Sequence, residues 1–359
     1  MTQCQEALAR SQQFAAWMGL PYPVLLAPMA GACPASLSIA VANGGGMGAC
    51  GVLMMSPDAI TSWVREVREN TDGVFQLNNW IPDPLPVRDT QHEQRVRSYL
   101  EQWGPPVPDT AAEIPVPDFA RQCEAMLAAK PAAISSIMGL YPEPFVALMK
   151  SAGIRWFATV TTVAEALQAE QAGADVIVAQ GMEAGGHRGA FNQQDAEGAL
   201  VGLFSLLPAV VDAVSVPVVA TGGIADARGA AAAMLLGASA VQVGTGFLRT
   251  TEADIATVWS DALGNTAPED TAATRAFSGR LGRSIKTSYV EAMSGVDAPK
   301  PAPFPIQRNL TQPMRAAAAT SNRIDAMQVW AGQSARLARI GSATDVVKDI
   351  WSEVESTLG

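Results

Sequence analysis

The residues best suited to chemistry lie in one short glycine-rich stretch, AQGMEAGGHRG, which spans Ala179–Gly189. An apolar strand is predicted to end at Gln180, and an acid, His187 and Arg188 follow among four glycines. Imidazole gains or loses a proton near neutral pH, and glycines let the backbone approach a ligand closely. A lone histidine is more often structural, but its place in a loop after a strand favours a catalytic His187. Arg188 is expected to face solvent.

Two more glycine-rich turns could bind a phosphate. Gly222–Gly223 follows one apolar run in ATGGIADARG, and Gly244–Thr245–Gly246 follows the next in VQVGTGF. Barrel enzymes often bind phosphate with backbone N–H groups of the loops after strands seven and eight. Ordinary turns between elements are the structural alternative. A further run, Leu25–Gly31, ends in small residues, and the exposed backbone there could accommodate a flat ring system.

A third glycine motif matches the dinucleotide fingerprint only in its letters. In a true G-x-G-x-x-G fingerprint, the glycines follow a strand and open a helix. Here Gly46, Gly48 and Gly51 follow a helix-like segment, SLSIAVAN, and the next helix is expected at Ser56–Pro57. We therefore expect no dinucleotide at this motif.

Eight short apolar runs predict a parallel sheet. They are near-continuous instead of alternating, which is typical of parallel strands covered on both faces. Helices are expected between them, one of them capped by Asp226 and ending near Gly237. Eight such units predict a closed (β/α)₈ TIM barrel, with a doubly wound open sheet as the alternative. The expected strands are Val24–Ala30, Gly48–Leu53, Val74–Asn78, Ala132–Ile137, Arg155–Val160, Asp175–Gln180, Pro217–Thr221 and Ala240–Gly244.

Composition divides the chain into three regions. The barrel is expected to occupy residues 1–249, with residues 81–119, rich in proline and charge, as a long insertion after the third strand. Residues 250–313 are rich in Gly, Pro, Arg and Ser and are predicted to form a small substrate-side domain over the barrel mouth. Residues 314–359 are predicted to form C-terminal helices that pack back on the barrel.

Composition also excludes several classes of protein. Hydrophobic residues make up 48% of the chain and charged residues 16%, which supports a large core and excludes general disorder. The net charge of −10, without a Lys/Arg cluster, argues against nucleic acid and anionic membranes. No secretory signal is recognised, so the four cysteines are expected to be reduced in the cytoplasm. His92 and His187 are the only histidines, and no metal is expected.

Eight segments together carry a family resemblance. They are APMAG at Ala27–Gly31, NGGGMG at Asn43–Gly48, QGMEAGGHRG at Gln180–Gly189, GGIADARG at Gly222–Gly229, QVGTGF at Gln242–Phe247, FSGRLGRSI at Phe277–Ile285, PFPIQRNLT at Pro303–Thr311 and WAGQSARLAR at Trp330–Arg339. In this order they resemble nitronate monooxygenase, formerly called 2-nitropropane dioxygenase, over nearly the whole chain. EAGGH is typical of a small group of FMN barrels, and the C-terminal segments favour the nitronate-oxidising class. GRLGRS departs from the family pattern, which commonly has a Pro-Ala pair before the arginine.

The resemblance implies the cofactor and the site. It implies FMN, no metal, and His187 as the active-site histidine. Asn78 and Gln180 would face the flavin, and glycines would hold its ring edge and phosphate. The full set of expected cofactor-binding residues is Ala27, Pro28, Met29, Asn78, Gln180, Gly185, Gly222, Gly223, Gln242, Val243, Gly244 and Thr245.

The implied reaction is the oxidation of alkyl nitronates, such as propionate 3-nitronate, with O₂ to carbonyl compounds and nitrite, as a detoxification. His187 could hold the anion as imidazolium, or remove the α-proton of a neutral nitroalkane as neutral imidazole. One alternative is an FMN- and NAD(P)H-dependent enoyl-acyl-carrier-protein reductase, and another is a non-catalytic flavin-binding barrel. The expected partners are a small nitro compound and O₂, without nucleic acid or membrane, and a homodimer is left open.

Overall fold

Eight parallel strands form a nearly closed barrel in the computed structural model, which describes residues 2–359. Their spatial order is β1-β9-β8-β6-β5-β4-β3-β2, and a parallel bridge between Leu25 and Met47 brings the two ends of the sheet together. The predicted TIM barrel is thus confirmed, and the alternative, a doubly wound open sheet, is excluded. The barrel strands are β1 (Val24–Leu26), β2 (Gly48–Gly51), β3 (Phe75–Trp80), β4 (Ala133–Ile137), β5 (Arg155–Val160), β6 (Val176–Gln180), β8 (Val218–Thr221) and β9 (Ala240–Val243).

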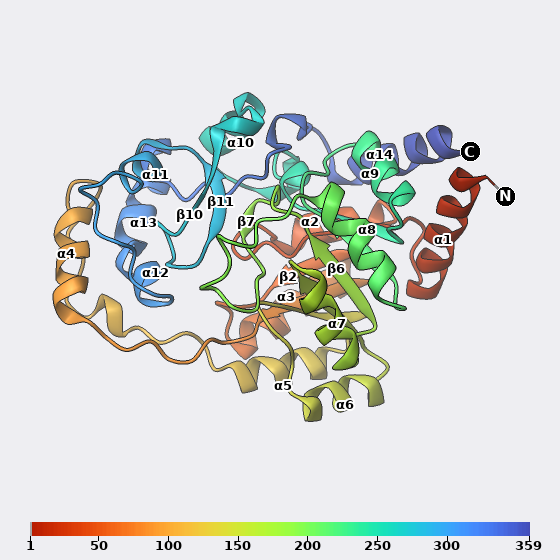
Figure 1. Ribbon diagram of the computed structural model, residues 1–359, viewed down its shortest axis with the longest axis horizontal. Coiled ribbons are helices and arrows are strands. Elements are labelled where there is room, and N and C mark those ends of the chain that lie inside the picture. Colours follow the sequence, from red (N-terminus) through yellow and green to blue (C-terminus); the bar gives the residue numbers. More distant parts are fainter. Residues whose placement is uncertain (1) are drawn as a thin grey trace.

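Helices surround this sheet, and side chains cap the first turns of several of them, including the predicted cap Asp226. The Asp226 side chain accepts a hydrogen bond from Gly229 N, and Thr162 accepts one from Glu165 N. The last helix lies beside the first, next to both chain ends (Figure 1). None of the helices within residues 2–359 has the length and apolar character needed to cross a bilayer. The barrel helices are α1 (Gln3–Met18), α2 (Ala35–Asn43), α3 (Pro57–Asn70), α5 (Phe119–Ala129), α6 (Glu143–Ser151), α7 (Val163–Gln171), α8 (Leu203–Ala213), α9 (Ala227–Leu235) and α14 (Ala343–Leu358).

Four strand ends differ from the prediction at the barrel mouth, among them those of β2, which ends at Gly51 instead of Leu53, and of β9, which ends at Val243 instead of Gly244. The expected strand Val24–Ala30 ends at Leu26, because Pro28 has no N–H for a ladder and Cys33 Sγ instead contacts Ala27 O and Met29 N, both at 3.3 Å. In contrast, β3 continues two residues past Asn78 and carries Trp80 to the rim. Around Gly46–Gly51, the order is helix then strand, as predicted.

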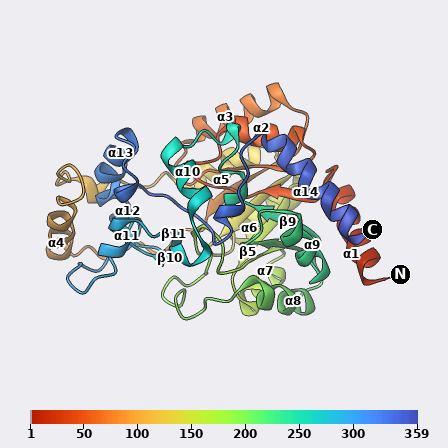
Figure 2. The same ribbon diagram turned by 90° about the horizontal axis from the view of Figure 1, so that it is seen from above.

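A second hydrophobic core lies beside the barrel mouth. It joins Leu100 and Val107 of the long insertion to Phe277, Tyr289 and Val329 of the C-terminal third. A three-stranded antiparallel sheet, β10-β11-β7, runs along it, with β10 at Thr271–Thr274, β11 at Gly282–Ile285 and β7 at Gly186–His187. Its helices are α4 (Thr90–Leu100), α10 (Thr257–Asn265), α11 (Ser288–Ala292), α12 (Ile306–Leu310) and α13 (Gln312–Thr320). Figure 2 shows α4, α11, α12 and α13 as a lobe at one end of the molecule, whereas α10 lies nearer the barrel.

The second core draws on all three predicted regions of the chain. Residues 81–119 contribute α4, and residues 250–313 contribute α10 to α12. Residues 314–359 contribute most of α13, which begins at Gln312, while α14 packs against α9 and α2 of the barrel. The domain boundaries at 249 and 313 stay a prediction. The short strand β7 was expected to be part of a loop. It forms because Gly186 and His187 pair with Arg283 and Gly282, so the loop after β6 joins the second sheet.

Candidate active site

A cavity of about 790 Å³ opens at the carboxyl ends of the barrel strands. In a TIM barrel this end carries the active site. His187 lines the cavity together with all but one of the residues expected to bind the cofactor. The exception is Val243, which is fully buried in the barrel core behind the lining. The residues brought together are Ala27, Pro28, Met29, Asn78, Gln180, Gly185, Gly222, Gly223, Gln242, Gly244 and Thr245.

One wall of the cavity is bare backbone. Gly222 and Gly223 have φ values of +105° and +71°, and a Cβ on Gly222 would lie 3.1 Å from Ala184 N. A Cβ on Gly244 would lie 3.2 Å from the Cβ of Ala27. These glycines leave room that side chains would fill, at the ends of the neighbouring strands β8 and β9. Such a cradle of backbone N–H groups fits the phosphate of a flavin nucleotide.

Amide side chains project into the cavity beside this cradle. Gln76 Nε2 donates to Gln242 Oε1 at 3.1 Å, so the NH₂ group of Gln242 is left to donate elsewhere. Asn78 Nδ2 donates to Ser135 Oγ at 3.0 Å. Fixed amides of this kind suit the polar edge of a flavin ring, so the residues present fit the cofactor. Their contact with a flavin stays a prediction.

Gln180 and Arg188 hold the loop that carries His187. Gln180 Nε2 donates to His187 O at 3.1 Å, and its Oε1 accepts from Gly189 N at 2.8 Å. The prediction that Arg188 faces solvent is wrong, because the side chain is buried. Its guanidinium donates to the carbonyl oxygens of Gln180 and Ala199 at 2.6 and 3.1 Å. Buried guanidinium groups require such acceptors, and here the loop backbone supplies them.

His187 lies between two tryptophans. The ring centroids of Trp80 and Trp330 are 4.6 and 4.8 Å from that of the imidazole, in edge-to-face geometry. The imidazole Nε2 lies 2.7 Å from Ser278 Oγ. Burial, followed by the positive charges of Arg280, Arg308 and Arg315, lowers the pKa of His187 to about 3. His187 is therefore neutral at neutral pH.

Two of these arginines give the cavity its charge. Arg308 and Arg315 line it, and within residues 2–359 no carboxylate forms an ion pair with either of them. Arg315 is held by Gln328 Oε1 and by Arg308 O, both at 2.9 Å. Arg280, by contrast, is paired with Asp83 of the long insertion. The cavity thus carries positive charge that an anionic ligand would neutralise.

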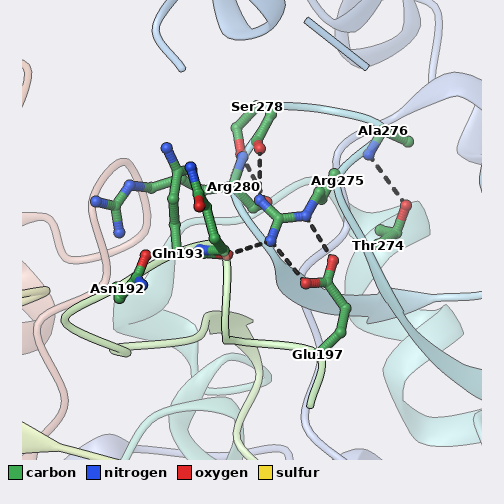
Figure 3. A network of polar contacts seen from close by, with 10 residues as sticks. Asn192, Gln193, Glu197, Thr274, Arg275, Ala276, Ser278 and Arg280 are labelled. Atoms are coloured by element: carbon green, nitrogen blue, oxygen red, sulfur yellow. Dashed lines mark hydrogen bonds and ion pairs between the residues drawn. The ribbon is translucent and has the colours of Figure 1, made fainter. Parts of the chain in front are cut away.

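The loop that carries Ser278 is fixed from outside the cavity (Figure 3). Arg275 forms an ion pair with Glu197 at 2.5 Å and donates to Gly279 O at 3.0 Å. It also bonds Gln193 O, so the segment after β6 and the segment before β11 are clamped together. Ser278, Arg308 and Trp330 lie in segments that carry the family resemblance, but no local pattern marks these three residues as part of the site.

Comparison with known proteins decides the family. The nitronate monooxygenase family model matches residues 12–353. The chain belongs to the nitronate monooxygenase family. A nitronate monooxygenase from Paraburkholderia phytofirmans is 38% identical over 95% of this chain and 94% of its own length. The recognition made from the sequence motifs is confirmed.

Solved structures agree with this assignment. The nitroalkane oxidase from Streptomyces ansochromogenes superimposes with a TM-score of 0.86 and 30% identity, covering 96% of this chain and all of its own. FabK from Thermotoga maritima gives a TM-score of 0.75 and 26% identity, covering 96% of both chains. Nitronate monooxygenases are flavin-dependent oxidoreductases, so this member is an enzyme with a flavin cofactor, and the non-catalytic alternative falls away.

The charge state of His187 in this family member can be measured directly. A His92→Gln variant without a histidine tag has His187 as its only histidine. We expect its imidazole NMR signals not to titrate between about pH 5 and 8, because burial and the arginines disfavour the charged form. In urea the same residue should titrate near its ordinary pKa of 6.5. A transition near 6.5 in the folded protein would show that the imidazole is not desolvated.

Proposed function

We propose that this protein uses FMN to oxidise alkyl nitronates with O₂, giving carbonyl compounds and nitrite. The observation that carries the proposal is the electropositive wall of the cavity, where Arg308 and Arg315 lie near a neutral His187. A nitronate is an electron-rich anion, and this wall matches its charge. FMN is favoured over FAD because the two glycine turns form one phosphate cradle on neighbouring strands.

The arginines bind and orient the anion. Both are partly buried, so their attraction for a nitronate is screened less than it would be in bulk water. Arg315 is already held by Gln328 and Thr311, so little side-chain entropy is lost when a ligand binds. When bound, the flavin supplies the electron acceptor for the nitronate and the electron donor for O₂.

His187 acts as the proton acceptor when the substrate is a neutral nitroalkane. Its imidazole is unprotonated at neutral pH and lines the cavity. As the α-proton leaves, negative charge grows on the nitro group and raises the pKa of the neighbouring imidazole. Trp80 and Trp330 keep the ring in place and restrict the access of water to it.

A second negative charge on the substrate would use the second arginine. Propionate 3-nitronate carries a carboxylate as well as a nitronate, and each anion could pair with one guanidinium. Charge-assisted hydrogen bonds between guanidinium and carboxylate are among the stronger contacts that proteins make. We therefore favour a carboxylate-bearing nitronate over a simple alkyl nitronate as the substrate.

We also propose that the enzyme works in the cytoplasm with a detoxifying role. Cys4, Cys33, Cys50 and Cys123 are free thiols, as expected for a reducing compartment. The enoyl-acyl-carrier-protein reductase alternative is weaker, because the family model and the named relatives are nitronate monooxygenases.

Oxygen uptake with propionate 3-nitronate, with and without NADH, tests the proposal. We expect uptake and nitrite formation without NADH, and we expect the flavin released on denaturation to be FMN. The reductase alternative predicts the reverse, namely no turnover until NADH and an enoyl thioester are supplied. Recovery of FAD would contradict the cofactor assignment alone.

Replacement of His187 by asparagine should separate the two forms of the substrate. We expect turnover of a neutral nitroalkane to fall about 10²- to 10⁴-fold, the usual cost of losing a general base. A preformed nitronate needs no proton removed and should be affected much less. Flavin absorbance should persist, because the glycine turns after β8 and β9 would hold the phosphate through backbone groups that this substitution does not change. His92→Asn serves as the control, and full activity of His187→Asn on both forms would refute the assignment.

Replacement of Arg308 by glutamine tests the carboxylate contact. We expect KM for propionate 3-nitronate to rise about 10- to 100-fold, because a hydrogen bond to a charged group is lost. An alkyl nitronate of similar length that lacks the carboxylate should show a smaller change. Arg336→Gln is the matched control, because Arg336 is exposed and lies outside the cavity. An equal rise for both substrates would assign Arg308 to the nitronate group instead.

A further inference from the structure

Ser278 makes the polar contact that orients the His187 ring. Its hydroxyl oxygen lies 2.7 Å from Nε2, and its side chain is almost fully buried. The serine cannot easily move away, because Arg275 clamps the same loop through Gly279 and Glu197 (Figure 3). Trp80 and Trp330 pack against the imidazole on either side and hinder a flip of the ring.

The neighbours of this hydroxyl group restrict its role toward His187. A serine hydroxyl donates one hydrogen bond and accepts two. Ser278 Oγ donates to Arg280 O at 3.2 Å and accepts from Arg280 N at 3.3 Å. No other donor within residues 2–359 reaches Arg280 O, and a buried carbonyl rarely stays unpaired. The proton of Ser278 is thus committed to Arg280 O, and one acceptor position remains for His187.

The remaining acceptor position faces Nε2, so this nitrogen must carry the proton. The other ring nitrogen, Nδ1, has no hydrogen-bond partner within residues 2–359. It is not fully enclosed by protein atoms, so it is open to the cavity that His187 lines. We propose that Ser278 is a positioning residue that holds His187 as the Nε2–H tautomer and presents the lone pair of Nδ1 to the substrate. This inference rests on the proposed role of His187.

The tautomer decides which atom can take a proton from the substrate. In a neutral nitroalkane the C–H bond at the α-carbon breaks, and the proton passes to Nδ1. The electron pair of that bond forms the π bond of the nitronate C=N. The π pair of the nitro N=O bond moves onto its oxygen, which gains the negative charge. Arg308 and Arg315 are available to neutralise that charge. A preformed nitronate skips this step, so Ser278 should matter mainly for neutral nitroalkanes.

Nitrogen NMR of the flavin-loaded protein tests the tautomer without any activity measurement. In a His92→Gln protein labelled with ¹⁵N-histidine, long-range ¹H–¹⁵N correlations distinguish the protonated ring nitrogen from the unprotonated one. We expect Nε2 to carry the proton and Nδ1 to be bare at pH 7. A proton on Nδ1 would mean that Ser278 donates to the ring, and it would overturn the proposal. This readout stands even if no nitro compound proves to be a substrate, so failure of the proposed function and failure of this inference are separable.

The Ser278→Ala variant tests the consequence for catalysis. We expect both tautomers to appear in the spectrum and kcat for a neutral nitroalkane to fall on the order of 10-fold, as one hydrogen bond is lost. Turnover of a preformed nitronate should stay within about 2-fold of the parent, and Ser278→Thr, which keeps the hydroxyl, should restore the single tautomer. Ser284→Ala is the matched control, since Ser284 is equally buried and bonds Val329 O instead. An unchanged tautomer in Ser278→Ala, or an equal loss on both substrate forms, would overturn the proposal. If Ser278→Ala does not fold, the parent spectrum still decides.

Discussion

The desolvation of His187 beside guanidinium groups governs the chemistry of this cavity. Burial and the charges of three arginines keep the imidazole neutral, so all of the positive charge in this part of the site resides on groups that do not titrate near neutral pH. Keeping Arg308 and Arg315 partly out of water without a carboxylate partner costs free energy. Such a cost is tolerable where a ligand, and not a protein side chain, supplies the compensating negative charge.

This arrangement requires two cores that share one loop. The barrel supplies the glycine cradle, whereas Ser278, Arg308 and Trp330 come from segments of the second core. The strand β7 connects the two, because it leaves β6 of the barrel and pairs with β11 of the small sheet. The C-terminal segment adds a second tie, where Gly332 N donates to Thr245 Oγ1 at 3.0 Å and Gln333 N to Glu183 O at 2.9 Å. The cradle and the charged wall are therefore held at a fixed separation by backbone contacts.

The sequence predicts those parts of the fold and site that depend on local patterns. Apolar runs of strand length identify the barrel strands, and the turns at Gly222–Gly223 are visible because positive φ values demand glycine. The end of β1 was predicted too late, at Ala30, although Pro28 cannot donate to a sheet. Contacts between distant segments were not readable: Ser278 meets His187 across 91 residues, and Arg188 is buried only because carbonyl groups of three separate segments converge on it. Nothing in the immediate neighbourhood of either residue indicates this.

A neutral histidine among permanent cations also allows one site to combine anion binding with proton acceptance, which a single imidazole could not do at the same time. An imidazolium would hold an anion but could not accept a proton, and a solvated imidazole would switch between the two states within the physiological pH range. In the proposed mechanism the arginines bind the anion at any pH near neutrality, and the histidine is left to accept a proton. A cavity that works in this way would receive a nitronate directly or generate one from its conjugate acid. TIM barrels as a fold host many chemistries. In this barrel, the proposed roles of the arginines as anion binders and of His187 as proton acceptor are what would suit the cavity to nitro compounds.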